Sequence, residues 1–251
     1  MQARMSSTRL PGKVLKEVSG TPLLAYELAR LKRSELIDTL VVATSDEPLD
    51  DAIAALCVSV GVECFRGSLD DVLSRYIGCA NLHPDHDVIV RVTGDCPLID
   101  AMVVDQTINF FIEGGYDYAS NVPTNEETFP DGMDCEVFTR AALMEAGEKA
   151  TLASEHEHPN AYIRNGAQFT HGGMKGEGKY GAYRLTVDNP EDFEVIKFLI
   201  EHCPADASYL DYVKMLDAHP EIKSLNMHIG HNEGYVKSLK EDKPFIDKTK
   251  K

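Results

Sequence analysis

Short apolar runs rich in β-branched residues alternate along the chain with segments of helical periodicity. The runs predict strands at residues 39–45, 61–65, 87–93, 116–122, 133–138 and 183–187. Helices are expected between them, at residues 48–59, 68–81, 97–113, 139–150 and 155–164. This alternation is typical of an α/β fold with a mainly parallel, twisted sheet flanked by helices. In such folds a ligand binds beyond the carboxyl ends of the strands.

Two helices have clear signals at their N-termini. Ser68, followed three residues later by Asp71, resembles a capping box. Asn189 and Pro190 fit the N-cap and the first helical position, and Asp192 places an acid in the first turn. The sequence therefore predicts that helices start at Ser68 and at Asn189.

A glycine-rich segment, residues 172–181, interrupts the alternation of strands and helices. It follows the helix expected at residues 155–164, and we expect it to form a hairpin or loop outside the main sheet. The whole chain, residues 1–251, is predicted to be a single domain. Residues 155–182 are then a loop insertion or a dimerisation element within it.

The composition is that of a globular protein, with 251 residues of which 43% are hydrophobic and 26% are charged. Its apolar stretches fall far short of the ~18 residues that a membrane-spanning helix needs. The chain does not open with a secretion signal, so we expect a cytoplasmic protein. The six cysteines are scattered without a C-x-x-C pair, which favours reduced thiols over disulfides or a zinc site.

The formal net charge is −16. A surface of this charge repels phosphate backbones and anionic membranes, so neither nucleic acid nor a membrane is an expected partner. The charge is uneven, because residues 1–16 contain Arg4, Arg9, Lys13 and Lys16 and no acid. A compact cationic segment in an acidic protein indicates a small anionic ligand, although charge alone leaves a solvated basic arm as the alternative.

The chemistry of this segment favours a phosphate ligand. Arg4, Arg9 and Lys13 recur at intervals of five and four residues within the sequence QARMSSTRLPGKVL. Arginine can bind phosphate oxygens through two hydrogen bonds, and lysine acts as a point charge. The hydroxyls and backbone N–H groups of residues 6–8 could surround an anion, and the Pro-Gly pair at residues 11–12 supplies a turn. Together these groups could neutralise a triphosphate.

Two aspartates follow predicted strands at the edge of the sheet where ligands bind. Asp95 comes after the strand at residues 87–93, and Asp188 comes after the strand at residues 183–187. Taken singly, Asp95 could be a turn residue and Asp188 a neighbour of the helix cap. As a pair opposite a cationic loop, they favour a Mg²⁺ site, because carboxylate oxygens are the ligands that Mg²⁺ prefers.

These segments resemble the motifs of the sugar-acid cytidylyltransferases. Residues 3–15 (ARMSSTRLPGKVL) are similar to the nucleotide-binding loop of that family, and residues 94–97 (GDCP) and 187–192 (VDNPED) to its two metal motifs. The chain most resembles the branch that acts in spore-coat polysaccharide biosynthesis. Further similarity to that branch lies at residues 66–76, 131–138 and 232–240.

The resemblance implies a nucleotide-diphospho-sugar transferase (GT-A-like) fold, a homodimer, and transfer of CMP from CTP to a sugar acid with release of pyrophosphate. It implies that Lys13 and Arg4 are catalytic and that Asp95 and Asp188 hold Mg²⁺. The nucleotide-binding residues that it implies are Gln2, Ala3, Arg4, Ser7, Thr8, Arg9, Lys13 and Arg75.

Two features of the chain depart from the family pattern. Members of the family have an apolar strand before the position of Gln2, which only Met1 precedes here, so either the true start lies upstream or the sheet lacks its first strand. The region that recognises the acceptor varies within the family, and here it contains residues 155–158 and Arg164. His156 and His158 are two residues apart and so lie on opposite faces of a helix, which favours a plain helix start over a metal site.

Two other functions stay open at this point. A glycosyltransferase that consumes a nucleotide-sugar would have the same fold, and Asp85 and Asp87 have the Asp-x-Asp spacing of such enzymes, although they precede the strand at residues 87–93. A catalytically impaired homologue that binds CTP without releasing pyrophosphate is the second alternative, suggested by the short N-terminal strand.

Overall fold

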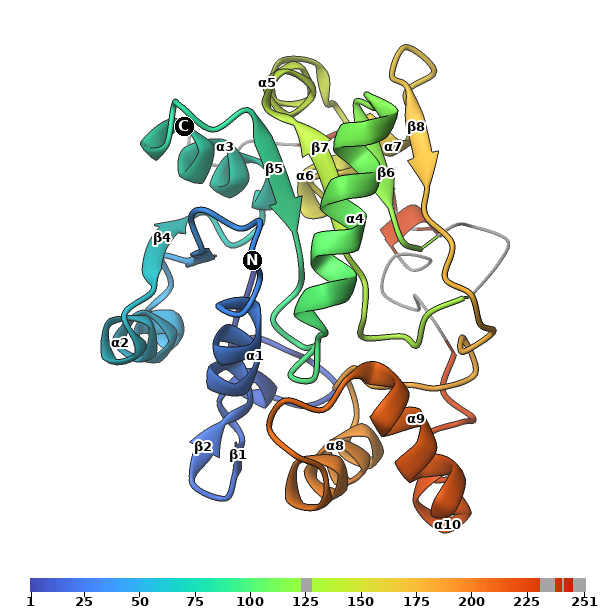
Figure 1. Ribbon diagram of the computed structural model, residues 1–251. Coiled ribbons are helices and arrows are strands. Elements are labelled where there is room, and N and C mark those ends of the chain that lie inside the picture. The colour runs from blue at the N-terminus through green and yellow to red at the C-terminus, as the bar shows by residue number, and fades with distance from the viewer. Residues whose placement is uncertain (123–127, 231–237, 241, 246–251) are drawn as a thin grey trace.

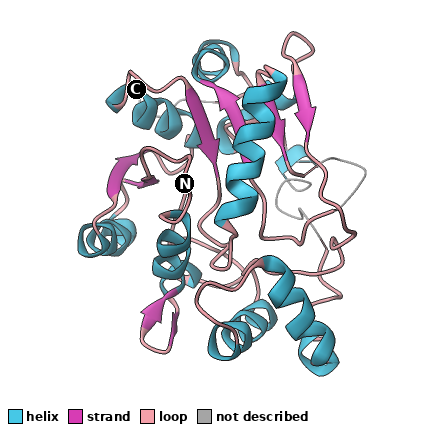
Figure 2. Cartoon of the chain, viewed as in Figure 1, coloured by secondary structure: helices cyan, strands magenta, loops and turns pink. Residues whose placement is uncertain are grey.

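The computed structural model describes residues 1–122, 128–230, 238–240 and 242–245, and it has an α/β fold (Figure 1). Its strands, drawn in magenta in Figure 2, are β1 (Glu17–Val18), β2 (Thr21–Pro22), β3 (Val41–Ser45), β4 (Glu63–Gly67), β5 (Val88–Arg91), β6 (Tyr118–Ser120), β7 (Glu136–Thr139) and β8 (His171–Gly173). Its α-helices are α1 (Leu23–Leu31), α2 (Asp51–Val60), α3 (Val72–Leu82), α4 (Ala101–Gly114), α5 (Arg140–Lys149), α6 (Ala153–Glu157), α7 (Ala161–Asn165), α8 (Pro190–His202), α9 (Tyr209–Ala218) and α10 (Pro220–Lys223). Short 3₁₀ helices lie at Lys13–Leu15 and Pro48–Asp50.

The central strands form a mixed arrangement. Four strands pair in the order β5-β7-β6-β8, and β3 pairs with β4 in parallel. Gln2 forms parallel bridges to both Ala43 of β3 and Thr93, just beyond β5, so the N-terminus lies between these two groups of strands. It does so through a single bridged residue instead of a full strand.

The expectation of a mainly parallel sheet is wrong for the four-stranded part. β7 runs antiparallel to both β5 and β6, and only the β6–β8 pair is parallel. The reason is the connection from β6 to β7, which contains no described helix. A parallel pair needs a crossover, usually helical, whereas a chain that turns back directly makes an antiparallel pair.

Alternate residues of β6 and β7 face opposite layers of helices, as the two-residue period of a strand requires. Tyr118 and Phe138 pack in a cluster with residues of α3 and α5. Ala119 and Val137 pack in another cluster with the apolar face of α4, which crosses in front of these strands in Figure 1. The sheet is thus buried on both faces, so a ligand can reach it only at the ends of its strands.

Most predicted elements are present, with changes at their ends. The helix expected to start at Ser68 begins after Asp71, whose side chain accepts a hydrogen bond from the Ser74 N–H. The helix expected at residues 97–113 begins at Ala101, with Asp100 as its N-cap. The helix expected at residues 155–164 is divided into α6 and α7.

Two expectations about strands are wrong. Residues 183–187 do not form a strand, and Arg184 makes only an isolated bridge to Asp131. Leu185 and Val187 of this run are buried, but none of the strands in the described part of the chain pairs with it. The glycine-rich segment is not wholly outside the sheet, because its first residues belong to β8.

The C-terminal part adds a further layer, with α8, α9 and α10 grouped in the lower part of Figure 1. The helix start predicted at Asn189 is present, since Asp192 accepts hydrogen bonds from the N–H groups of Asp188 and Asn189. Within the described residues, every helix is too short or too polar to cross a membrane. Residues 232–237, part of the family resemblance, lie outside the described residues. A dimer contact through residues 155–182 stays a prediction.

Candidate active site

The cationic loop after Gln2 is held in a fixed path by its backbone. The N–H of Met5 donates to the buried Asp50 carboxylate at 2.7 Å, and the Met5 carbonyl accepts from the Gly12 N–H at 3.0 Å. Gly12 has φ +68°, a left-handed conformation that residues with a Cβ rarely adopt. The loop therefore closes on itself directly before Lys13.

One cavity of about 810 Å³ gathers the residues that the sequence singled out. It lies beside this loop and beyond the carboxyl end of β5, at the edge of the sheet where α/β proteins bind ligands. All ten predicted site residues line it: Gln2, Ala3, Arg4, Ser7, Thr8, Arg9, Lys13, Arg75, Asp95 and Asp188.

Lys13 lies between the two predicted metal ligands. Its ammonium group is 2.7 Å from Asp95 Oδ2 and 2.9 Å from Asp188 Oδ1, and it also donates to the Val187 carbonyl at 2.7 Å. Burial disfavours the charge of Lys13, but the two carboxylates raise its pKa. Burial likewise disfavours the ionised form of Asp95, yet Lys13 lowers the pKa of Asp95 to about 2. Lys13 and Asp95 are therefore both charged at neutral pH.

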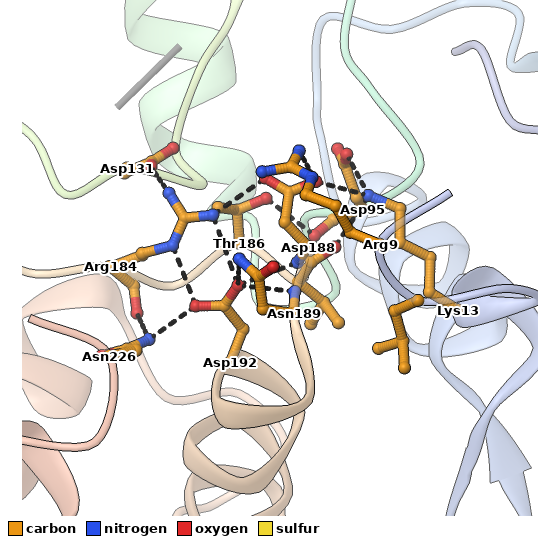
Figure 3. A network of polar contacts seen from close by, with 12 residues as sticks. Arg9, Lys13, Asp95, Asp131, Arg184, Thr186, Asp188, Asn189, Asp192 and Asn226 are labelled. Carbon is orange, nitrogen blue, oxygen red and sulfur yellow. Dashed lines mark hydrogen bonds and ion pairs between the residues drawn. The ribbon is translucent and has the colours of Figure 1, made fainter. Parts of the chain in front are cut away.

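A buried arginine, Arg184, orients Asp188 from the other side (Figure 3). Its guanidinium donates to Asp188 Oδ2 at 2.8 Å, to Asp192 Oδ1 at 2.8 Å and to Asp131 Oδ2 at 2.5 Å. Arg9 binds the remaining Asp188 oxygen at 2.7 Å. Asp188 is thus held on both carboxylate oxygens by cations.

The structure explains why residue 132, within the family-like segment 131–138, is a glycine. Gly132 has φ +102°, and a Cβ there would lie 2.6 Å from the backbone carbon of Leu185. The two chain segments approach this closely because Asp131 is bridged to Arg184. Only glycine allows the approach, so Gly132 brings Asp131 within reach of the arginine.

Two other arginines in the cavity have no carboxylate partner among the described residues. Arg4 is exposed at the cavity wall, and Arg75 is 2% exposed and donates through one nitrogen to the Ala43 carbonyl. The Nε of Arg75 is buried and makes no hydrogen bond within the described part of the chain. Unpaired guanidinium groups beside a cavity are suited to an anionic ligand.

The carboxylates of the cavity fit Mg²⁺ only in combination with a substrate. The described residues contain no group of three or more His, Cys, Asp or Glu side chains that could hold a metal ion by themselves. Mg²⁺ is commonly held by one or two carboxylates together with substrate phosphates and water. Asp95 and Asp188 could supply two such carboxylates, and both of them bind Lys13 in this structure.

Sequence reasoning missed Arg184, Asp50 and most of the far wall of the cavity. Of that wall, only Glu157 and His158 lie within residues 155–158, the region that the resemblance assigns to the acceptor. The one indication of Arg184 in the sequence is that it is a charged residue inside the apolar run at residues 183–187. The far wall consists of residues from α6, the residue after it, and the C-terminal segment: Ala153, Ser154, Glu157, His158, Ser238 and Lys243. His156 and His158 point to different partners, Asp71 and Ser238.

Replacing Arg184 with methionine is expected to lower the free energy of unfolding by about 3–5 kcal/mol, because three carboxylates then lose their buried partner. Urea unfolding followed by circular dichroism measures the change. The matched control is Lys214→Met, because Lys214 is 76% exposed and lies 3.6 Å from Asp211, so its loss should cost about 0–1 kcal/mol. Equal effects of the two substitutions would contradict the role of Arg184.

The same network predicts how this difference depends on pH. Burial tends to raise the pKa of Asp192, but Arg184 holds it below its usual value. Such a carboxyl stabilises the fold above about pH 3.9, its pKa in the unfolded chain, and the stabilisation is lost as the pH falls through the lower native pKa. The stability difference between the parent and Arg184→Met should therefore shrink below about pH 4.

Comparisons with known proteins agree with this site. The sequence model of the family described as cytidylyltransferase matches residues 1–219. The spore coat polysaccharide biosynthesis protein SpsF of Bacillus subtilis is 34% identical over 232 residues, which is 88% of this chain and 94% of SpsF. A 3-deoxy-manno-octulosonate cytidylyltransferase of Geobacter metallireducens is 34% identical over 111 residues, 42% of this chain and 41% of that enzyme. The solved structure of a cytidylyltransferase from Leptospira borgpetersenii has a TM-score of 0.83 at 36% identity, covering 92% of this chain and 97% of its own.

The α/β fold and its cation-lined cavity, taken with these similarities, are those of a nucleotidyltransferase. Because the family match spans most of the sequence, the chain belongs to the cytidylyltransferase family. The resemblance found in its motifs is thereby confirmed.

Proposed function

We propose that this cytidylyltransferase transfers CMP from CTP to a sugar acid for the biosynthesis of a surface polysaccharide, on a GT-A-like fold. The observation that carries the proposal is the cavity in which the cationic loop faces Asp95 and Asp188 across Lys13. The acceptor class is taken from the names of the relatives, one of which acts on 3-deoxy-manno-octulosonate.

In the proposed reaction a hydroxyl oxygen of the acceptor attacks the α-phosphorus of CTP. A new P–O bond forms to the acceptor, the bond from the α-phosphorus to the bridging oxygen breaks, and pyrophosphate leaves with the electron pair. The hydroxyl proton passes to solvent. This chemistry needs alignment and neutralisation of charge but no covalent intermediate with the enzyme. Lys13 and Arg4 supply positive charge beside the phosphates.

Asp95 and Asp188 are the residues that would hold Mg²⁺ in this reaction. The ion, when bound with CTP, would neutralise phosphate charge and so lower the cost of bringing an anionic acceptor close to it. Lys13 would then exchange its present carboxylate partners for phosphate oxygens, since the ion and the ammonium group compete for the same carboxylates.

The remaining loop residues are proposed to bind the nucleotide. The backbone of Gln2 and Ala3 lies between β3 and the residues that follow β5, and it would contact cytosine. Ser7, Thr8 and Arg9 line the cavity and would contact the phosphates, and Arg75 adds a buried guanidinium whose Nε makes no hydrogen bond within the described residues.

The position of the Asp-x-Asp sequence disfavours the glycosyltransferase alternative. Asp85 and Asp87 precede β5, whereas Asp95 follows it, so the two sets of carboxylates lie at opposite ends of that strand. The metal-binding acids of a glycosyltransferase would have to face the same cavity as its nucleotide, and Asp85 and Asp87 do not line it.

Replacing Arg4 with methionine is expected to weaken CTP binding by about tenfold or more, because a hydrogen bond to a charged group is worth roughly 1.5–3 kcal/mol. Arg4 is exposed, so the fold should be unaffected. Titration calorimetry with CTP measures the change. Arg33→Met is the control, since Arg33 is exposed and donates to the Ala205 carbonyl away from the cavity. Parental affinity in Arg4→Met would remove Arg4 from the nucleotide site.

The experiment that tests the proposed function is a screen for pyrophosphate release. CTP, UTP, ATP and GTP are each combined with Mg²⁺ and a panel of sugar acids that includes 3-deoxy-manno-octulosonate and N-acetylneuraminate. We expect release with CTP and at least one acid. CTP binding without release under every condition would favour the impaired homologue instead, and nucleoside diphosphate release from a nucleotide-sugar would favour the glycosyltransferase.

A further inference from the structure

The C-terminal segment, described at residues 238–240 and 242–245, forms part of the cavity wall although it lies beyond the 219 residues that the family match covers. Its backbone docks in strand-like fashion beside the start of α6. The Ala153 N–H donates to the Lys243 carbonyl at 2.8 Å, and the Phe245 N–H donates to the Thr151 carbonyl at 2.8 Å. An antiparallel bridge joins Leu152 to Pro244 between them.

Side chains on both sides of Lys243 fasten the segment to α6. The Asp242 carboxylate accepts from the Ser154 hydroxyl at 2.7 Å and from the Ser154 N–H at 3.1 Å. The Phe245 ring stacks on His156 with centroids 3.6 Å apart and planes inclined by 7°. The segment is thus anchored at residue 242 and at residue 245, and Lys243 lies between the two anchors.

A second contact extends this wall toward residue 238. The Ser238 hydroxyl lies 3.2 Å from Nε2 of His158 and donates to Glu157 at 2.8 Å. All three side chains line the cavity. Burial lowers the pKa of His158 to about 4, so this imidazole is neutral at pH 7. The wall therefore offers hydroxyl, imidazole and carboxylate groups that can bind sugar hydroxyls.

Lys243 supplies the positive charge of this wall. Its side chain lines the cavity, and it has no ion-pair partner among the described residues. The neighbouring Asp242 is directed to Ser154 instead, as expected where successive side chains of an extended segment point in opposite directions. A lysine that is fixed through its backbone on a cavity wall, and that forms no ion pair with the described residues, is suited to a ligand anion.

The cavity already provides cations for a triphosphate, namely Arg4, Arg9 and Lys13 of the loop and Arg75 of α3. The second substrate of the proposed reaction also carries a negative charge, its carboxylate. We propose that Lys243 binds the carboxylate of the sugar-acid acceptor, which makes the docked C-terminal segment a specificity element of the active site. This inference rests on the proposed function and names a residue that binds its acceptor substrate.

The test compares the full-length parent with Lys243→Met, Lys243→Arg and the control Lys240→Met. Lys240 is an exposed lysine of the same segment that does not line the cavity. Steady-state pyrophosphate release is measured with the best sugar acid of the screen and with its methyl ester, which lacks the negative charge. Binding of CTP alone is measured by calorimetry.

Lys243→Met is expected to raise the KM for the sugar acid by about tenfold or more and to abolish the preference for the acid over its ester. Its affinity for CTP should change less than twofold. Lys243→Arg should retain most of the preference, and Lys240→Met should behave as the parent. The preference for the acid separates charge recognition from a structural role, because general loosening of the wall would affect acid and ester alike.

Two results would overturn the inference while leaving the proposed function intact. In the first, Lys243→Met keeps the parental KM for the sugar acid and the parental preference for the acid over its ester. In the second, Lys243→Met loses affinity for CTP as much as for the sugar acid, which would assign Lys243 to the nucleotide. A parent protein that releases no pyrophosphate from CTP would instead overturn the proposed function, and this inference with it.

Discussion

Replacing Lys13 with methionine should lower kcat for pyrophosphate release by about 10²–10³-fold. Loss of one preorganised electrostatic contact to a transition state typically costs about 2.7–4 kcal/mol, which corresponds to that factor. Lys13 is the group best placed to supply such a contact, because its ammonium is buried at the cavity between Asp95 and Asp188. Initial rates at saturating CTP measure the effect.

The control for this substitution is Lys16→Met. Lys16 is the next lysine along the chain, but it does not line the cavity and lies over the Phe193 ring at 4.9 Å. It should retain parental turnover. Circular dichroism must show that Lys13→Met is folded at the assay temperature, since the two aspartates lose a shared partner. Turnover within a few-fold of the parent in folded Lys13→Met would remove Lys13 from the catalytic role.

Replacing Asp95 with asparagine should reduce turnover by a similar 10²–10³-fold and also raise the Mg²⁺ concentration needed for half-maximal activity. Asparagine keeps the size of the side chain but removes the charge that attracts both the ion and Lys13. Turnover measured as a function of Mg²⁺ concentration separates the two effects, because only a ligand of the ion should shift the metal dependence.

Asp85→Asn is the matched control for Asp95→Asn. Asp85 is exposed and precedes β5, whereas Asp95 follows it. The proposed function predicts parental activity and metal dependence in Asp85→Asn. A loss of activity in Asp85→Asn with little change in Asp95→Asn would be the opposite result. It would indicate that the metal site lies at the other end of β5 and would support the glycosyltransferase alternative.

Local chemistry was sufficient to find four of the charged residues that line the cavity. Arg4 and Lys13 share a short segment without acids, and Asp95 and Asp188 each follow an apolar run. Each of these patterns consists of residues that are close together in the sequence, so it can be recognised without knowing the fold. That these residues line one cavity is a property of the fold, and their roles stay predictions.

The supports of the site could not be predicted because they join distant segments. Arg184 binds Asp131, which lies 53 residues away and is reached only through the close approach at Gly132. The Lys243 carbonyl accepts a hydrogen bond from the Ala153 N–H, and the two residues are far apart in the sequence. Neither pair has a local signal beyond one charged residue inside an apolar run.

Strand direction was the other feature that local patterns did not determine. The run at residues 133–138 was predicted as a strand, and most of β7 lies within it. Its antiparallel pairing depends on the connection from β6, not on the residues of the strand itself. The run at residues 183–187 is largely apolar and buried like a strand, yet within the described residues it forms only an isolated bridge to Asp131.

The central claim is that the carboxylates, Lys13 and the cationic loop act together on one nucleotide. The measurement that tests it most directly is ³¹P NMR of the reaction of the parent with CTP, Mg²⁺ and the best sugar acid. We predict that the α-phosphate signal of CTP is replaced by that of a sugar phosphodiester as pyrophosphate appears in equal amount. Pyrophosphate accompanied by free CMP, or an unchanged CTP spectrum with every acid, would contradict the account.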